Sequence, residues 1–144
     1  LTGFAIDNRK VAPGTVFGAF QGQRVNGEDY IADAIRAGAI AVVARPEAHV
    51  EGAIHIAHAN PRRLFAQLAA RYFAPFPDVT VAVTGTNGKT STVELVRQVW
   101  RMMGEASASI GTLGVTTSVE QVSTGLTTPD IVTFLSRSTS LTST

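Results

Sequence analysis

The sequence predicts an α/β fold in two parts: a small mixed-sheet N-terminal domain, followed by the first strand, loop, helix and strand of a parallel-sheet domain. Two observations predict it. Short runs rich in valine, isoleucine and alanine alternate with segments whose apolar residues recur every three or four positions, the periods of strands and helices. Residues 74–77, Ala-Pro-Phe-Pro, then make a stiff connector, so we expect domains at 1–77 and 78–144.

The composition excludes several classes of protein. The chain has 144 residues, of which 44% are hydrophobic and 16% charged, as is typical of a globular protein with a real core. A net charge of +1, without a run of Lys or Arg, gives no case for nucleic-acid binding. The absence of cysteine excludes disulfides and thiolate chemistry. No apolar run approaches the roughly 20 residues of a membrane helix, so we expect a cytoplasmic protein.

The first domain is predicted to have the order β-β-α-β-β followed by a helix. Gly38 occupies the C-cap position of its first helix, and Asn60-Pro61 supplies an N-cap and a first-turn proline for the second. The strands are expected at residues 4–6, 16–20, 39–44 and 53–57, and the helices at residues 28–37 and 61–73.

A nucleotide-phosphate cradle is predicted where an apolar strand runs into a glycine loop and then a helix. Three valines within residues 79–83 suit a buried strand between Pro77 and Gly85. From residue 88 the apolar spacing becomes helical, and residues 107–110 read as the next strand. This order predicts a parallel β-α-β unit, in which the unpaired N–H groups at the helix start attract anions.

Each residue type in the loop has a physical role. Gly85 and Gly88 let the backbone curl closely around oxygen atoms. Lys89 is able to reach the outer phosphates, and the hydroxyl of Thr90 is able to ligate Mg²⁺. The match to the P-loop is partial, because that motif has a glycine where this chain has Val83. The alternative is an ordinary helix N-terminus with a solvated lysine, and the flanking strand and helix favour the phosphate site.

Two segments follow the second strand of that unit. Residues 111–114 lie at its carboxyl end, where open α/β sheets bind ligands, and residues 115–125 are expected to form a polar hairpin. Thr127 and Thr128 precede a helix predicted through about residue 135. This pair serves either as the N-cap of that helix or as a functional pair.

The three histidines are candidates for a metal site. His55 and His58 are three positions apart, which puts them on opposite faces of an extended segment. Packed or solvated histidines, His49 included, are therefore favoured over metal ligands.

The chain resembles the Mur ligase family, the ATP-dependent amide-forming enzymes of peptidoglycan precursor synthesis. Residues 84–90, Thr-Gly-Thr-Asn-Gly-Lys-Thr, are similar to the phosphate loop of that family, which also lacks the distant glycine. Residues 7–17, together with Gly22 and Asn26-Gly27, are similar to the N-terminal domain shared by its MurE and MurF types. The loop and residues 126–130, Leu-Thr-Thr-Pro-Asp, look like the MurE type.

The resemblance implies site residues. Lys89 is the implied catalytic residue, on the outer phosphates of ATP, and Thr90 is the implied Mg²⁺ ligand. The implied nucleotide-binding set is Gly85, Thr86, Asn87, Gly88, Lys89, Thr90 and Ser91. The implied substrate-binding set is Ile6, Asn8, Gln23, Arg24 and Val25 at the uridine diphosphate end, and Thr127 and Thr128 at the sugar-peptide part. Asn8 and Asn26 depart from the family, which usually has Ser and Asp at those positions.

The implied function is that of a ligase that adds the third stem-peptide amino acid to UDP-N-acetylmuramoyl-L-Ala-D-Glu through an acyl phosphate. It uses ATP, Mg²⁺ and a diamino acid, and we expect a monomer without nucleic-acid or membrane partners. The start at Leu1 and the Ser/Thr-rich end at residues 136–144 lead us to expect a piece of a longer enzyme, inactive alone. Three alternatives stay open: a MurF-type ligase, a folylpolyglutamate synthetase-like ligase, and a non-catalytic UDP-sugar-binding module.

Overall fold

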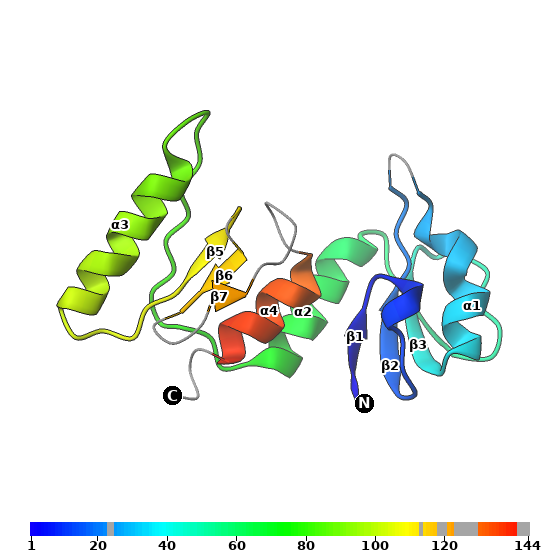
Figure 1. Cartoon of the computed structure of the whole chain (residues 1–144). Coiled ribbons are helices and arrows are strands. Elements are labelled where there is room, and N and C mark those ends of the chain that lie inside the picture. Colours follow the sequence, from blue (N-terminus) through cyan, green and yellow to red (C-terminus); the bar gives the residue numbers. More distant parts are fainter. Residues whose placement is uncertain (23–24, 113, 118–120, 123–129, 141–144) are drawn as a thin grey trace. The chain divides into compact units, whose positions relative to one another are not determined.

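The computed structural model describes residues 1–22, 25–112, 114–117, 121–122 and 130–140. The chain divides into two compact units, Leu1–Tyr72 and Phe73–Thr144 (Figure 1). Each unit combines helices with a small sheet, so the predicted α/β class is confirmed. Within the described residues, no helix is long and apolar enough to cross a membrane.

The sheet of the first unit is wholly parallel, whereas the sequence favours a mixed sheet. Its order is β1-β2-β3-β4, and every neighbouring pair runs in the same direction. The strands are parallel because each connection carries the chain back to the end of the sheet at which the preceding strand began. A tight hairpin would instead start the next strand at the opposite end. The elements are β1 (Gly3–Ala5), η1 (Asn8–Lys10), β2 (Thr15–Gly18), η2 (Gly27–Tyr30), α1 (Ile31–Arg36), β3 (Ala39–Ala44) and β4 (Ile54–Ala57), where η marks a 3-10 helix.

The two faces of this sheet are covered by different helices, α1 and α2 (Pro61–Phe73), which lie on opposite sides of β1–β3 (Figure 1). Side chains alternate along a strand, so Val42 packs toward α1 in a cluster that includes Ile31. On the other face Phe65 of α2 meets Phe4 edge to face, with ring centroids 5.3 Å apart. Burial of each large apolar side chain contributes about 1.5–3 kcal/mol. The largest fully buried side chains are Phe17, Phe65, Val42 and Val43.

Two predicted helix ends of the first unit are confirmed. Gly38 has φ +106°, and its N–H donates to the carbonyl of Ile35 over 3.0 Å. Only glycine fits there, because a Cβ would lie 2.7 Å from the Cα of Pro13. At the start of α2 the side-chain oxygen of Asn60 accepts from the N–H of Arg63 over 3.2 Å.

The second unit contains an antiparallel sheet in place of the expected parallel β-α-β unit. The strand predicted at residues 79–83 is wrong: these residues form no regular structure, and Val79 and Val81 are 64% and 53% exposed. A strand needs a partner for its backbone groups, and β5, the expected neighbour, pairs with β6 and forms no ladder with residues 79–83. The sheet is formed by β5 (Ser109–Gly111), β6 (Gly114–Thr116) and β7 (Gln121–Val122), in that order.

Two helices complete the second unit, α3 (Lys89–Met102) and α4 (Ile131–Ser140). The polar hairpin predicted over residues 115–125 is represented by the antiparallel pair β6 and β7. The N-cap of α4 is Asp130, whose carboxylate accepts the N–H groups of Val132 and Thr133, each over 3.0 Å. The sequence pattern suggested Thr127 and Thr128 for this role, and both lie outside the described residues.

Candidate functional site

The loop before α3 begins the helix without a side-chain cap. Gly88 is the N-cap residue, with φ +77°, and Gly85 has φ +150°. These are backbone conformations that glycine adopts without strain. Because no side chain caps the helix, its first N–H groups stay available to an anion, and the helix dipole favours negative charge at this end.

A hollow of about 310 Å³ opens above this helix start. Six of its seven lining residues belong to the predicted nucleotide-binding set, and the seventh, Thr112, directly follows β5. The chain therefore gathers the predicted loop residues around one space of a size that admits a phosphate group. The lining residues are Thr86, Asn87, Gly88, Lys89, Thr90, Ser91 and Thr112.

The ammonium group of Lys89 lies against its own loop. Its Nζ donates to the carbonyl oxygen of Gly85 and, over 3.3 Å, to that of Thr86. These two contacts hold the positive charge on the loop that leads into the helix start. Both features attract anions, so the geometry at Lys89 suits a phosphate rather than a cation.

Three polar contacts join α3 to the segment that leads into and out of β5. The Ser107 hydroxyl donates to the carbonyl of Arg97 over 3.0 Å, and the Ser109 hydroxyl donates to Glu94 over 3.4 Å. The third contact joins the hydroxyls of Thr90 and Thr112, 3.0 Å apart. The segment runs back along the helix toward its N-terminus, so these contacts bring Thr112 to the hollow.

A charged pair within α3 lies between these contacts. The Arg97 side chain is 9% exposed, and its Nε lies 3.1 and 3.0 Å from the two carboxylate oxygens of Glu94. The hydrogen bond from Arg97 lowers the pKa of the Glu94 carboxyl, and partial burial opposes that shift. The carboxylate stays ionised at neutral pH and able to hold both Arg97 and Ser109.

The donors around the hollow suit a magnesium ion that is mostly held by phosphate and water. Thr90 presents a hydroxyl there, and hard oxygen ligands are what Mg²⁺ prefers. Among the described residues no three His, Cys, Asp or Glu side chains come together as a metal site. Mg²⁺ commonly keeps several waters and binds through few protein ligands plus substrate phosphates, so the Thr90 hydroxyl fits its needs.

The histidines make ordinary polar contacts. The Nε2 of His55 lies 3.1 Å from the carbonyl oxygen of Arg45, and the Nδ1 of His58 accepts from the N–H of Asn60 over 2.9 Å. His49 lies on the surface beside Glu51.

A second group of predicted site residues follows the carboxyl ends of the parallel strands in the first unit. Ile6 and Asn8 come directly after β1, and Val25 belongs to a turn that follows β2. Ile6 and Val25 expose much of their side chains. Parallel strands bring their carboxyl ends to one edge of the sheet, where ligands of open α/β sheets bind. Gln23 and Arg24 lie outside the described residues.

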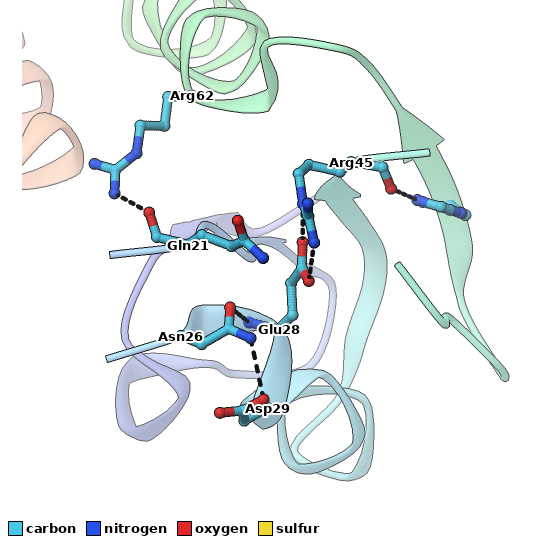
Figure 2. Close-up of polar contacts among 7 residues, drawn as sticks. Gln21, Asn26, Glu28, Asp29, Arg45 and Arg62 are labelled. Atoms are coloured by element: carbon cyan, nitrogen blue, oxygen red, sulfur yellow. Dashed lines mark hydrogen bonds and ion pairs between the residues drawn. The ribbon is translucent and has the colours of Figure 1, made fainter. Parts of the chain in front are cut away.

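The base of this turn is fixed by backbone contacts. Gln21 and Asn26 form an antiparallel bridge, and the N–H of Gly22 donates to the carbonyl of Val25 over 3.0 Å. Arg62 of α2 donates to the carbonyl of Gln21 over 2.8 Å (Figure 2). The turn is therefore anchored to the helix that covers one face of the sheet.

Figure 2 also shows how charged and amide side chains hold the other side of the turn. The Asn26 side chain accepts from the N–H of Glu28 and donates to Asp29, each over 3.2 Å. Arg45, the residue that follows β3, binds both carboxylate oxygens of Glu28, over 2.8 and 2.9 Å. Hydrogen bonding from Arg45 lowers the pKa of Glu28, against the opposing effect of its burial.

Sequence reasoning missed three residues of these sites. Thr112 lines the hollow. The sequence predicts that residues 111–114 lie near a ligand, but it does not single out Thr112. Arg45 and Glu28 are 17 positions apart, and each alone is typical of a solvated surface residue. No local spacing links the members of such a pair, so a sequence signal for them is absent.

Comparison with known proteins identifies the relatives of the chain. The model of the Mur ligase family, catalytic domain, matches residues 1–84, and the Mur ligase middle domain matches residues 83–143. A protein of Zymomonas mobilis named UDP-N-acetylmuramoyl-L-alanyl-D-glutamate--2,6-diaminopimelate ligase is 63% identical over 93% of this chain and 28% of its own length. A protein of the same name from Bradyrhizobium diazoefficiens is 45% identical over 90% of this chain and 27% of its own length.

Two solved structures are also similar to this chain. A structure of a UDP-N-acetylmuramoyl-L-alanyl-D-glutamate--2,6-diaminopimelate ligase matches 95% of this chain with a TM-score of 0.77 and 26% identity. A MurF ligase from Thermotoga maritima in complex with ADP matches 69% of it with a TM-score of 0.58 and 31% identity. The chain spans 28% and 23% of those two chains, and about a quarter of the length of the curated relatives named above.

Proposed function

The chain belongs to the Mur ligase family, and from this premise we propose that it is the front part of a MurE-type ligase. Such an enzyme adds the third amino acid of the stem peptide to UDP-N-acetylmuramoyl-L-Ala-D-Glu, at the expense of ATP. The 63% identity to a diaminopimelate ligase supports this type. The same name supports a diamino acid as the incoming amine, and diaminopimelate as the first one to test.

We further propose that the two parts of the chain divide the work. Residues 1–77 receive the uridine diphosphate end of the substrate, and residues 78–144 begin the ATP-binding part. The single observation that carries the nucleotide site is the hollow lined by residues 86–91 and Thr112. The N–H groups of the helix start, Gly88 and Lys89 are what a triphosphate requires.

The proposed nucleotide contacts follow from this hollow. Lys89 turns its ammonium from the loop carbonyls to the outer phosphates, and Gly85 and Gly88 let the backbone approach them. Thr90 is the proposed Mg²⁺ ligand, and Mg²⁺ when bound supplies neutralisation of the phosphate charge. Catalysis of phosphoryl transfer is mostly positioning and charge stabilisation, so these residues act by binding and orienting ATP.

The proposed uridine diphosphate contacts lie at the end of the first sheet where its parallel strands have their carboxyl ends. Ile6 and Asn8 follow β1 there, and the turn that contains Gln23, Arg24 and Val25 follows β2. Thr127 and Thr128 are proposed to contact the sugar-peptide part, because of the resemblance at residues 126–130. Asn8 stands where the family usually has Ser, and its amide is able both to donate and to accept a hydrogen bond.

The reaction proposed for the full gene product has two stages. The γ-phosphoryl group of ATP passes to the carboxylate of the muramoyl dipeptide, and the amine of the diamino acid then displaces phosphate from that acyl phosphate. We propose a monomeric enzyme that acts in the cytoplasm, where ATP is made. The proposed function would lose support if the full gene product consumed no ATP when given the UDP-muramoyl dipeptide and diaminopimelate.

Calorimetry tests the two proposed sites separately. We expect MgADP and UDP each to bind the full gene product, and Lys89→Met to weaken MgADP at least tenfold without changing UDP binding, because charge-assisted hydrogen bonds are strong. Arg101→Met is the matched control, since it removes a cation at the far end of the same helix. UDP binding without any MgADP binding would instead favour a non-catalytic UDP-sugar-binding module.

A further inference from the structure

Thr112 is a residue of the hollow that the proposed function leaves without a role. It lies 22 positions from Thr90 in the sequence, yet their hydroxyl oxygens are 3.0 Å apart. Thr112 also lines the hollow together with the six loop and helix residues. A hydroxyl that contacts both another hydroxyl and an anion-binding space is in a position to link them.

The fold fixes the place of Thr112 at several points. Ser107 and Ser109 bind α3 two turns and one turn beyond Thr90, at Arg97 and Glu94. On the other side Gly111 pairs with Gly114 of β6. Because β5 is held by both neighbours, the residue that directly follows it has little freedom to leave the first turn of α3.

The chemistry of a hydroxyl ligand explains what Thr112 can do. A hydroxyl that ligates a cation uses an oxygen lone pair, so its hydrogen points away from the metal and needs an acceptor. The oxygen of Thr112 is in hydrogen-bond distance to accept that hydrogen. The hydrogen of Thr112 is then free to turn into the hollow, where phosphate oxygens are strong acceptors.

We propose that Thr112 is a positioning residue for Thr90 and a hydrogen-bond donor to the nucleotide phosphates, so that the two hydroxyls act as one unit in metal-nucleotide binding. This proposal rests on the proposed nucleotide site and adds to it a residue outside the loop motif. The Thr112 hydroxyl has two roles. Its oxygen orients the Thr90 ligand, and its hydrogen contacts a phosphate.

The test measures binding of ADP to the full gene product by calorimetry, with and without Mg²⁺. We expect Thr112→Val, which keeps the shape and removes the hydroxyl, to weaken MgADP about tenfold, the scale of one hydrogen bond to a charged group. Thr112→Ser keeps the hydroxyl and should stay within about twofold of the original. Thr92→Val is the matched control, an exposed threonine of α3 outside the hollow, and should change nothing.

Two further readouts separate positioning from a general structural role. With Mn²⁺ as a probe, Thr112→Val should weaken the metal–ADP complex more than it weakens ADP alone. Thr90→Val should cost less in the Thr112→Val background than in the original protein, because coupled residues are not additive. Equal losses with and without metal, or additive losses, would overturn the linked role.

The outcomes also distinguish the two levels of the proposal. If the original protein binds MgADP and Thr112→Val binds it equally well, the role of Thr112 is wrong and the proposed function stands. If the original protein binds no MgADP, the nucleotide site is wrong and the role of Thr112 falls with it. If Thr112→Val lowers the melting temperature, Thr112→Ala and Thr112→Ser are compared instead, and only the alanine variant should lose affinity.

Discussion

Arg45, which follows β3, and Glu28, in the first turn of η2, form a two-point ion pair with distances of 2.8 and 2.9 Å. The Glu28 side chain is 13% exposed and that of Arg45 is 38% exposed. The loss of one partner therefore has unequal consequences. Without Arg45 a mostly buried carboxylate is left unpaired, whereas without Glu28 the guanidinium remains partly in water.

We accordingly predict that Arg45→Met lowers the free energy of unfolding more than Glu28→Gln does, and that Glu28→Gln lowers it by about 0.5–1 kcal/mol. Urea unfolding followed by far-ultraviolet circular dichroism measures both. Arg36→Met is the control, because it breaks a pair with Asp33 whose side chains are 78% and 46% exposed, and it should cost under about 0.5 kcal/mol. An equal cost for Arg36→Met and Arg45→Met would contradict the buried role of the pair.

The same ion pair predicts a pH dependence. Hydrogen bonding from Arg45 holds the pKa of folded Glu28 below its ordinary value of 4.5. A depressed carboxyl pKa gives stability that is present above the unfolded pKa and is lost as the pH falls through the folded one. The stability difference between the original protein and Glu28→Gln should therefore be constant above about pH 5.5 and shrink below about pH 4.5.

Urea midpoints measured from pH 3 to pH 7 check this expectation. The carboxylates of Asp7 and Glu94 also have lowered pKa values, so both proteins lose stability in acid. That shared loss cancels in the difference between the two proteins. A difference that stays unchanged down to pH 3 would show that Arg45 does not favour the ionised form of Glu28.

We predict that asparagine at position 26 makes the folded protein more stable than aspartate would. Its amide donates to the Asp29 carboxylate over 3.2 Å, a hydrogen bond that an aspartate carboxylate cannot make. Asn26→Asp keeps an oxygen that caps the N–H of Glu28 but sets two carboxylates side by side. We expect a loss of about 0.5–1 kcal/mol at pH 7, because a hydrogen bond is replaced by repulsion between two like charges.

Urea unfolding of the variant at pH 7 measures this effect. Asn26→Ser is a useful control, since serine is able to cap the helix start without adding charge. If the Asn26→Asp variant were as stable as the original protein at pH 7, the Asp29 side chain would have to turn away from position 26. The site would then tolerate the residue that is usual in the family.

The parts of the fold that depend on local chemistry were predictable from the sequence. The third strand, residues 39–44, has the predicted bounds because its apolar run is delimited by Gly38 and Pro46. Gly38 and Asn60 mark helix ends through their own backbone and side-chain geometry. The direction of the strands was not predictable in the same way, because it depends on where each connection returns.

The parts that depend on distant partners were not predictable. The valines of residues 79–83 have strand propensity, but within the described part of the chain no strand pairs with them, although β5 is an edge strand of its sheet. Thr112 reaches the hollow through contacts of Ser107 and Ser109 with α3, and hydroxyl residues carry no periodic signal. The glycine loop, in contrast, was recognisable because its residues are adjacent in the sequence and line one space.

Two glycines that share a positive φ should respond differently to substitution. A Cβ on Gly38 would meet the Cα of Pro13 at 2.7 Å, whereas a Cβ on Gly88 would meet nothing within 4 Å. Gly88→Ala therefore costs only the left-handed conformation, about 1–2 kcal/mol. Gly38→Ala adds a backbone clash, and we predict a loss clearly above 2 kcal/mol, on the order of 3 kcal/mol.

Urea unfolding of the two variants measures the difference, and two other glycines serve as controls. Gly104→Ala should match Gly88→Ala, because it has φ +86° and open space around the site of its Cβ. Gly3→Ala should cost little, since Gly3 has neither a positive φ nor a neighbour within 4 Å of that site. If Gly38→Ala cost no more than Gly88→Ala, the turn at Pro13 would have to move freely, and the close packing of the two turns would not contribute to the stability of the first unit.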